Sequence, residues 1–206
     1  MYSRRAISDL ITGVTLACLV LMSLACAADP KGESATFLQS GLEYYEKADY
    51  KRAVLQLRNA AQLSQGDPEP YYQLARTYLK LQNVREAVVA LKKATELDPQ
   101  HREAQLLLAD LMLASRDPDV LRNAEQLVET VLSSESADPE ARFLLAAAKI
   151  RLGDDGDAEE LFEEVLRTSP DHLKSSIALA LLKLKAQDSA AAESILRAAA
   201  EWPTNW

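Results

Sequence analysis

Residues 68–101 read PEPYYQLARTYLKLQNVREAVVALKKATELDPQH, and this stretch decides the fold of the chain. In each half, apolar and small side chains recur at spacings of three and four residues, which places them on one face of an α-helix. They are Tyr71, Leu74, Ala75 and Tyr78 in the first half, and Ala87, Leu91 and Ala94 in the second. Asp98-Pro99 follows, and a residue before proline avoids the helical region. The stretch therefore predicts two amphipathic helices joined by a tight turn.

The small residues of this stretch recur along the whole chain at intervals of 34 residues, with one interval of 37. The first series is Gly41, Ala75, Ala109, Ala146 and Ala180, and the second is Ala53, Ala87, Ala124, Ala158 and Ala192. This period is typical of stacked helix-turn-helix units that cover each other's apolar faces. We therefore expect an all-α fold, an α-solenoid of five units. The units are residues 34–67, 68–101, 102–138, 139–172 and 173–206.

The third unit is three residues longer than the others. Its middle contains Asp117-Pro118-Asp119, a sequence that favours a turn. We therefore expect the three extra residues to lie in the turn between the two helices of this unit.

The composition agrees with a folded helical chain and disfavours one class of ligand. Hydrophobic residues make up 48% of the 206 residues, and all 8 prolines lie outside the periodic apolar segments. The formal net charge is −8. Nucleic-acid binding requires a basic surface, so this charge argues against a phosphate backbone as the main ligand.

The repeat resembles the tetratricopeptide repeat (TPR) family. The pattern of that family has an aromatic residue, Leu-Gly/Ala and Tyr in the first helix, and Ala, Phe/Leu, Ala and a closing Pro in the second. The second unit matches every site, with Tyr71, Leu74, Ala75, Tyr78, Ala87, Leu91, Ala94 and Pro99. The other units match in part. The resemblance implies a protein-binding scaffold in which the first helices of the units line a concave groove.

A second row of side chains on these first helices is the candidate partner-binding groove. Most of its members are large and apolar, which suits an amphipathic helix or an extended peptide. The candidates are Leu38, Leu42, Tyr45, Tyr72, Arg76, Leu79, Leu106, Asp110, Leu113, Phe143 and Ile150. The competing interpretation is that part of this row packs between neighbouring helices as core.

No motif for catalysis, a metal or a cofactor is present in the sequence, so we expect no enzyme. The two histidines, His101 and His172, occupy equivalent turns between units, and we expect a structural role for them. The acidic segment at 153–157 resembles a calcium loop but lacks the EF-hand pattern. It falls where the other units have their turn, and we interpret it as a turn.

The N-terminus resembles a secretion signal. Two arginines precede an apolar run over residues 10–28, and polar residues follow. We interpret residues 1–25 as a lipoprotein-type signal peptide, because small residues precede Cys26, which would be acylated. The alternatives are ordinary cleavage near Ala27 or Ala28, which would give soluble export, and an uncleaved membrane anchor. Residues 26–33 would form a tether, which predicts a protein on the periplasmic face of a bacterial membrane.

The C-terminal end is unusually apolar for the end of a solenoid. The fifth unit, with Ile177-Ala178-Leu179-Ala180-Leu181-Leu182, is the most apolar, and the last residues include Trp202 and Trp206. Such an end predicts self-association, packing on a partner, or continuation into a longer repeat protein. We therefore expect a non-enzymatic scaffold in the bacterial envelope, for envelope assembly, secretion or polysaccharide export. The alternative is a regulatory or accessory N-terminal part of a longer repeat protein or enzyme.

Overall fold

The computed structural model describes residues 30–201, and within this range the chain forms ten helices and no strand. The predicted all-α solenoid is therefore confirmed. The helices are α2 Pro30–Glu46, α3 Tyr50–Leu63, α4 Pro68–Lys80, α5 Val84–Leu97, α6 Arg102–Met112, α7 Pro118–Ser134, α8 Pro139–Leu152, α9 Asp155–Thr168, α10 Leu173–Lys185 and α11 Ser189–Glu201. The predicted signal peptide, Cys26 and both tryptophans lie outside the described residues.

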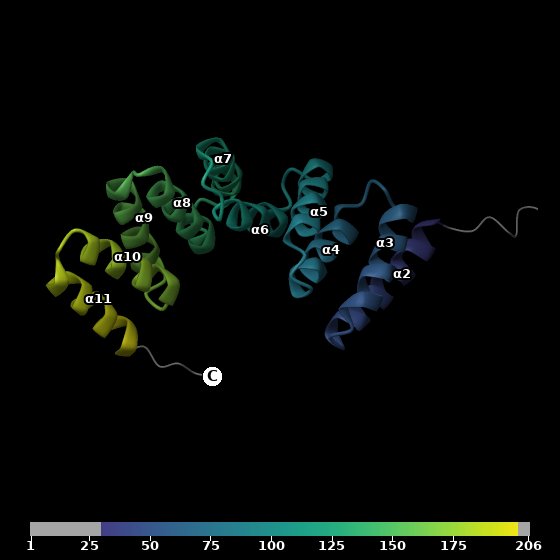
Figure 1. The fold of residues 1–206 in the computed structure, drawn as a ribbon, viewed down its shortest axis with the longest axis horizontal. Coiled ribbons are helices and arrows are strands. Elements are labelled where there is room, and N and C mark those ends of the chain that lie inside the picture. The colour runs from purple at the N-terminus through teal and green to yellow at the C-terminus, as the bar shows by residue number, and fades with distance from the viewer. Residues whose placement is uncertain (1–29, 202–206) are drawn as a thin grey trace, which may run out of the picture.

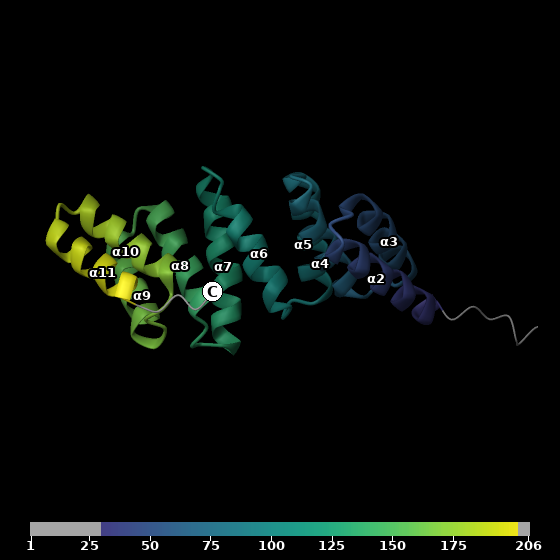
Figure 2. The same ribbon diagram turned by 90° about the horizontal axis from the view of Figure 1, so that it is seen from below.

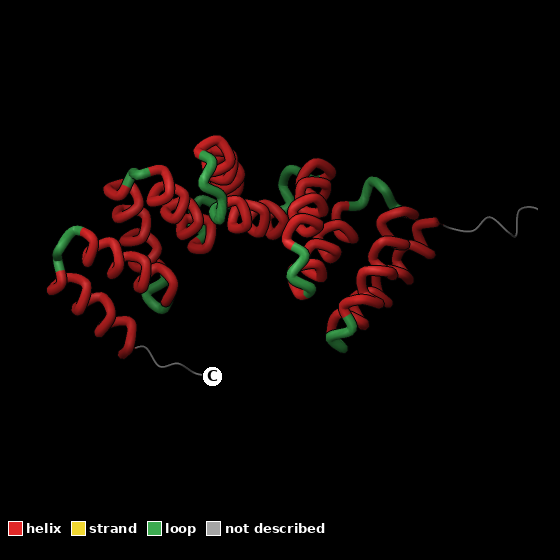
Figure 3. Tube along the Cα trace, viewed as in Figure 1, coloured by secondary structure: helices red, strands yellow, loops and turns green. Residues whose placement is uncertain are grey.

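The helices pack in consecutive antiparallel pairs that stack into an arch (Figure 1). We call the first helix of each pair the A helix (α2, α4, α6, α8, α10) and the second the B helix. In the middle of the arch, α6 lies on the inner side and α7 on the outer side. Figure 2 shows the same stack from below, and Figure 3 shows that the loops between helices are short. In the middle of the arch, the concave surface is therefore carried by the A helix.

Aspartates and prolines define where several helices begin. The side chains of Asp49, Asp67, Asp117 and Asp138 each accept a hydrogen bond from a backbone N–H in the first turn of the next helix. In α4, α7 and α8, proline occupies the first turn, where its missing N–H costs nothing. These caps are local sequence signals, and they fix the units in register.

The first helix starts earlier than the sequence analysis indicated. Helix α2 begins at Pro30, so residues 30–33 are helical rather than part of the predicted tether at 26–33. The side chain of Ser34 is buried and donates a hydrogen bond to the carbonyl of Ala60 at 3.0 Å. This contact anchors the beginning of the array on helix α3.

The third unit also differs from the prediction. Its three extra residues do not simply lengthen the turn, because helix α7 has 17 residues where α3, α5 and α9 have 14. Ala124 lies one helical turn further from the start of its helix than Ala87 does from the start of α5. Asp117 caps the added turn and Pro118 starts it. The insertion is therefore an extra turn of helix at the beginning of α7.

The core is a series of clusters along the arch rather than a single centre. The small residues of both predicted series are buried, which lets A and B helices approach closely. One apolar cluster joins α3, α4, α5 and α6, a second joins α6, α7 and α8, and a third joins α8, α9 and α10. Because each cluster shares a helix with the next, each unit is stabilised by its neighbours.

His101 links two consecutive A helices. Its Nδ1 accepts a hydrogen bond from the backbone N–H of Ala104 at 3.4 Å, so it caps helix α6. Its ring lies 4.8 Å from the ring of Tyr72 on α4, measured between centroids, and its Nε2 lies 3.6 Å from Glu69. The side chain therefore joins the start of α6 to the preceding A helix.

His172 makes the same link two units later. Its Nδ1 accepts from the backbone N–H of Ser175 at 3.2 Å and caps α10. Its ring lies 5.5 Å from the ring of Phe143 on α8, and its Nε2 lies 3.4 Å from Glu140. Both histidines thus have the structural role that their equivalent positions predict.

Candidate functional site

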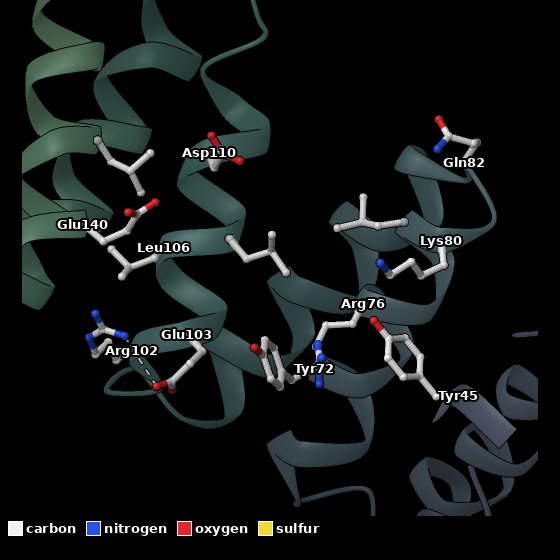
Figure 4. A pocket seen from close by; sticks show the side chains of 13 residues that line it. Tyr45, Tyr72, Arg76, Lys80, Gln82, Arg102, Glu103, Leu106, Asp110 and Glu140 are labelled. Carbon is white, nitrogen blue, oxygen red and sulfur yellow. Dashed lines mark ion pairs between the residues drawn. The ribbon is translucent and has the colours of Figure 1, made fainter. Parts of the chain in front are cut away.

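A pocket of about 650 Å³ opens between α2, α4, α6 and α8 (Figure 4). Its walls combine tyrosine and leucine side chains with both signs of charge. The lining residues are Tyr45, Tyr72, Arg76, Leu79, Lys80, Gln82, Arg102, Glu103, Leu106, Leu107, Asp110, Glu140 and Leu144. A concave site with apolar walls and a few charged groups is the ordinary form of a binding site for a peptide or small ligand.

Arg76 lies between two tyrosines in this pocket. Its guanidinium carbon is 5.0 Å from the centre of the Tyr45 ring and 5.8 Å from that of Tyr72. It donates a hydrogen bond to Gln73 at 2.9 Å. Cation–π contacts and this hydrogen bond fix the position of the guanidinium at the wall of the groove (Figure 4).

Asp110 carries negative charge on helix α6 in the same pocket. It remains exposed, yet surrounding protein displaces part of its water. This desolvation raises the pKa of Asp110; nearby Lys174 opposes the rise and Glu140 adds to it. Its carboxylate is therefore less stable as an anion than an ordinary surface aspartate.

Arg102 reaches the pocket but is already bound to acidic side chains. Its Nε lies 2.5 Å from the Asp138 carboxylate and 3.3 Å from that of Glu135. Its guanidinium is also 3.6 Å from Glu103. Arg102 thus connects α6 to the turn before α8, which is a structural use of its charge.

Asp138 is the buried partner in this link, with 1% of its side chain exposed. Burial by itself would raise its pKa, but the hydrogen bonds from Arg102 and from the backbone N–H groups of Ala141 and Glu140 outweigh it. The pKa of Asp138 is consequently lowered below its ordinary value.

Six of the predicted groove residues lie together in the pocket. They come from three A helices, and the pocket has the mixed apolar and charged character that their pattern predicts. They are Tyr45, Tyr72, Arg76, Leu79, Leu106 and Asp110. Whether they bind a partner stays a prediction.

The other five predicted residues do not line the pocket. Leu38 packs against the cluster of α3 to α6, Leu113 against the second cluster and Ile150 against the third. Phe143 contacts both the second and the third cluster, while Leu42 is half-buried on α2. For Leu38, Leu113, Phe143 and Ile150, packing against the core clusters is the role that the structure shows.

The prediction missed the remaining lining residues, most of which carry charge or amide groups at helix ends. On α8 the pocket is lined by Glu140 and Leu144, which lie on a neighbouring face from Phe143. The sequence signal that could have indicated these lining residues is the pair of charged residues at the start of α6, Arg102 and Glu103.

A row of exposed apolar side chains follows helix α10. The exposed fractions are 45% for Ile177, 61% for Leu181 and 48% for Leu184. At equivalent positions of α8, Phe143 and Ile150 are partly buried against the third cluster. The described chain has no helix after α11 to cover the row on α10.

Within residues 30–201, no group of three or more His, Cys, Asp or Glu side chains is arranged to hold a metal ion. Only the first two residues of the acidic segment at 153–157 form a turn: Gly153 has a φ of 100° and ends α8, and Asp154 precedes α9. Residues 155–157, which are also part of the predicted turn, are instead the first turn of helix α9. Among the helices of this range, none is both long and apolar enough to cross a membrane.

Comparison with protein families identifies the repeat. A family model described as the cytochrome c-type biogenesis protein H TPR domain matches residues 33–172. The chain belongs to this tetratricopeptide repeat family. Its fold is consistent with protein–protein interaction, and TPR families are generally non-enzymatic scaffolds.

A curated relative and several solved structures are similar to the TPR chain. Tetratricopeptide repeat protein 21B of Xenopus laevis is 29% identical over 168 residues. This alignment covers 81% of the chain but only 12% of the relative, so the chain spans a small part of that protein.

The similar structures support the fold alone. MamA from Desulfovibrio magneticus RS-1, residues 41 to the end, has a TM-score of 0.74 at 20% identity, covering 84% of this chain and 95% of that one. The Pseudomonas aeruginosa PilF structure has a TM-score of 0.69 at 16% identity, covering 87% and 80% respectively.

Proposed function

We propose that this TPR array is a non-enzymatic scaffold that binds a peptide or helix of a partner protein in the groove of its A helices. The observation that supports this most is the pocket of about 650 Å³, which draws side chains from four consecutive A helices. Its leucine and tyrosine walls offer apolar area, and its charges offer orientation. A partner segment lying along the arch would contact several units at once.

Site-specific crosslinking tests this proposal in cells that produce the chain. A photoreactive phenylalanine derivative replaces Leu79 in the pocket, and a matched variant carries it at Val89, which is 64% exposed on the B helix α5. We expect a discrete crosslinked protein from position 79 and none from position 89. Equal crosslinking from both positions, or none from position 79, contradicts groove binding.

The identified partner then allows a direct measurement. In purified form, it should bind the Leu79→Glu variant at least tenfold more weakly than the original chain, since a buried charge opposes apolar contact. Val89→Glu, on the outer helix, should leave the affinity within about twofold.

We further propose that the scaffold acts outside the bacterial cytoplasm, held on the membrane by acylation of Cys26. The basic start, apolar run and small residues before this cysteine support the proposal. Labelling with palmitate should mark the original chain and the Cys18→Ala variant but not Cys26→Ala. Equal label in all three contradicts the proposal. Envelope assembly, secretion and polysaccharide export are candidate processes, and the description of the matching family model adds cytochrome c biogenesis.

Two proposals concern the exposed row on α10. Its apolar side chains support either self-association through the last unit or the alternative that the chain is an N-terminal part of a longer repeat protein or enzyme. Sedimentation of the original chain and of Leu181→Glu tests the first, because an exposed charge in the contact should reduce the oligomer. The codons after Trp206 in the source genome test the second.

A further inference from the structure

The charges of the pocket are separated along the arch. Arg76 and Lys80 come from α4, whereas Asp110 comes from α6 and Glu140 from α8. Figure 4 shows Arg76 and Lys80 on the side of Tyr45, and Asp110 and Glu140 on the opposite side, where Arg102 also lies. Arg102 is paired with acidic side chains and Glu140 with Lys174. Among the described residues of the pocket, the charges left without an ion pair are therefore positive on α4 and negative at Asp110.

The basic end has charge available for a ligand. Within residues 30–201, no carboxylate lies within ion-pair distance of Arg76 or Lys80; Arg76 is held instead by Gln73 and two tyrosine rings. These contacts orient the guanidinium without neutralising it. Its remaining donors suit a carboxylate, which guanidinium groups bind with matching geometry.

The acidic end has charge available as well. In the described part of the chain, Asp110 forms no ion pair, because the nearby Lys174 is 2.8 Å from Glu140 and pairs with that residue. The desolvation that raises the pKa of Asp110 makes its carboxylate costly in the unliganded groove. A bound cation would offset this cost.

We propose that the groove binds an extended segment of a partner protein that carries an acidic side chain and, about three residues away, a basic one. The acidic side chain would pair with Arg76, the basic one with Asp110, and the apolar residues between them would contact Leu79 and Leu106. This inference rests on the proposed groove binding and adds the chemistry of the partner.

Arg76 and Asp110 are on successive A helices that line the same pocket. An extended chain advances about 3.3 Å per residue, so three residues cover roughly 10 Å. We take this separation of the two charged side chains as part of the proposal.

Four labelled synthetic peptides of equal length test the inference by fluorescence anisotropy with the full chain. All have the same leucine and alanine positions, and they differ only at two sites three residues apart. The sites hold Glu and Lys in the first peptide, two Glu in the second, two Lys in the third and two Gln in the fourth. We expect the Glu/Lys peptide to bind most tightly, with each charge contributing up to about fivefold.

Neutral variants assign each charge to its residue. In the Arg76→Gln variant, a Glu in the peptide should no longer increase the affinity, whereas a Lys still should. In the Asp110→Asn variant, a Lys should no longer increase the affinity, whereas a Glu still should. Arg85→Gln on α5 and Glu129→Gln on α7 are exposed controls that should change nothing. The advantage of Lys should also decline as the pH falls through the raised pKa of Asp110, and Asp110→Asn should not show this decline.

The outcomes separate this inference from the proposed function. In one outcome, all four peptides bind and Leu79→Glu weakens the binding of each, but the Glu/Lys peptide binds no more tightly than the others. The proposed arrangement of charges in the ligand is then wrong, while groove binding stands. Equal weakening of all peptides by Arg76→Gln also overturns the polarity. If no peptide binds or Leu79→Glu has no effect, groove binding itself fails.

Discussion

Asp138 combines two functions at one residue. It accepts hydrogen bonds from the backbone N–H groups of Glu140 and Ala141, both at 3.0 Å, and so caps helix α8. It also pairs with Arg102 of the preceding A helix. A carboxylate that holds both a helix start and a neighbouring unit is favoured as an anion, which explains its lowered pKa.

We predict that Asp138→Asn destabilises the chain at neutral pH by about 2 kcal/mol, because the amide keeps the cap but leaves Arg102 without its buried partner. The pKa of Asp138 is lower in the folded state, so its stabilisation is present above the ordinary aspartate pKa and disappears as the pH falls through the lowered one. Urea unfolding of both proteins over this pH range measures the difference.

A surface aspartate provides the control for this prediction. Asp119 pairs with Arg122 at the start of α7, and both side chains are largely exposed. Asp119→Asn should therefore change the free energy of unfolding by less than about 0.5 kcal/mol. An Asp138→Asn effect that persists at acidic pH would contradict the assignment of the stabilisation to the carboxylate.

At the scale of the helix, the caps of α6 and α10 are exceptional because histidine performs them. A histidine at this position can accept from a backbone N–H with one nitrogen and present its ring to the preceding A helix. Shorter caps such as Asp67 only satisfy the backbone. The two histidines thus connect their helices to the preceding A helix, as Asp138 does through Arg102 and Asp67 does not.

Two substitutions separate these contributions in α6. His101→Asn keeps a good cap and removes the ring contact with Tyr72, for which we expect a loss of about 1 kcal/mol. His101→Ala removes the cap as well and should cost about 1 kcal/mol more. Thermal or urea unfolding measures both. Equal stability of the two variants would show that the cap contributes nothing.

Most helices could be predicted from sequence because the period, the prolines and the capping aspartates are local signals. The extra turn of α7 could not, since Asp117-Pro118 is as compatible with a helix start as with a turn, and only the packing of Ala124 distinguishes the two. The start of α2 was missed because the polar residues 30–33 have no apolar periodicity. The hydrogen bond of the buried Ser34 side chain to Ala60 of α3 anchors this end of α2, and such a contact between distant residues cannot be read from the sequence.

The pocket was predicted in part for a related reason. A pattern on one helix shows which face is apolar, and it correctly brought Tyr72, Arg76 and Leu79 together. It does not show how neighbouring units pack on each other, which decides whether the same row faces the groove or the next helix. Phe143 and Ile150 therefore appeared as groove residues although they pack against clusters of the core.

At the scale of the whole molecule, none of the apolar clusters within residues 30–201 joins the two ends of the array. The buried residues of each cluster come from three or four helices, and α6 and α8 are the helices that contribute such residues to two of these clusters. The stability of such a chain is close to a sum of unit and neighbour contributions. Damage in one cluster should therefore spread to adjoining units and decline beyond them.

We predict this locality for Ala75→Leu, which inserts a large side chain at a fully buried site between α4 and α5. Overpacking should cost about 1–3 kcal/mol. Hydrogen exchange should become faster in α3 to α6 and stay unchanged in α9 to α11. The same substitution at the exposed Ala200 should leave α3 to α6 unaffected. Faster exchange throughout the chain would indicate one cooperative unit instead.

The ring contact between His101 and Tyr72 also affects the entropy that is lost when a ligand binds. Tyr72 is part of the pocket wall, and the contact joins α4 to the residue that caps the start of α6, two helices that both line the pocket. The separation of the two walls is thus set before a ligand arrives. A ligand then loses its own conformational entropy on binding but does not have to order the receptor. Loosening this one contact would therefore lower affinity without altering any atom that the ligand touches.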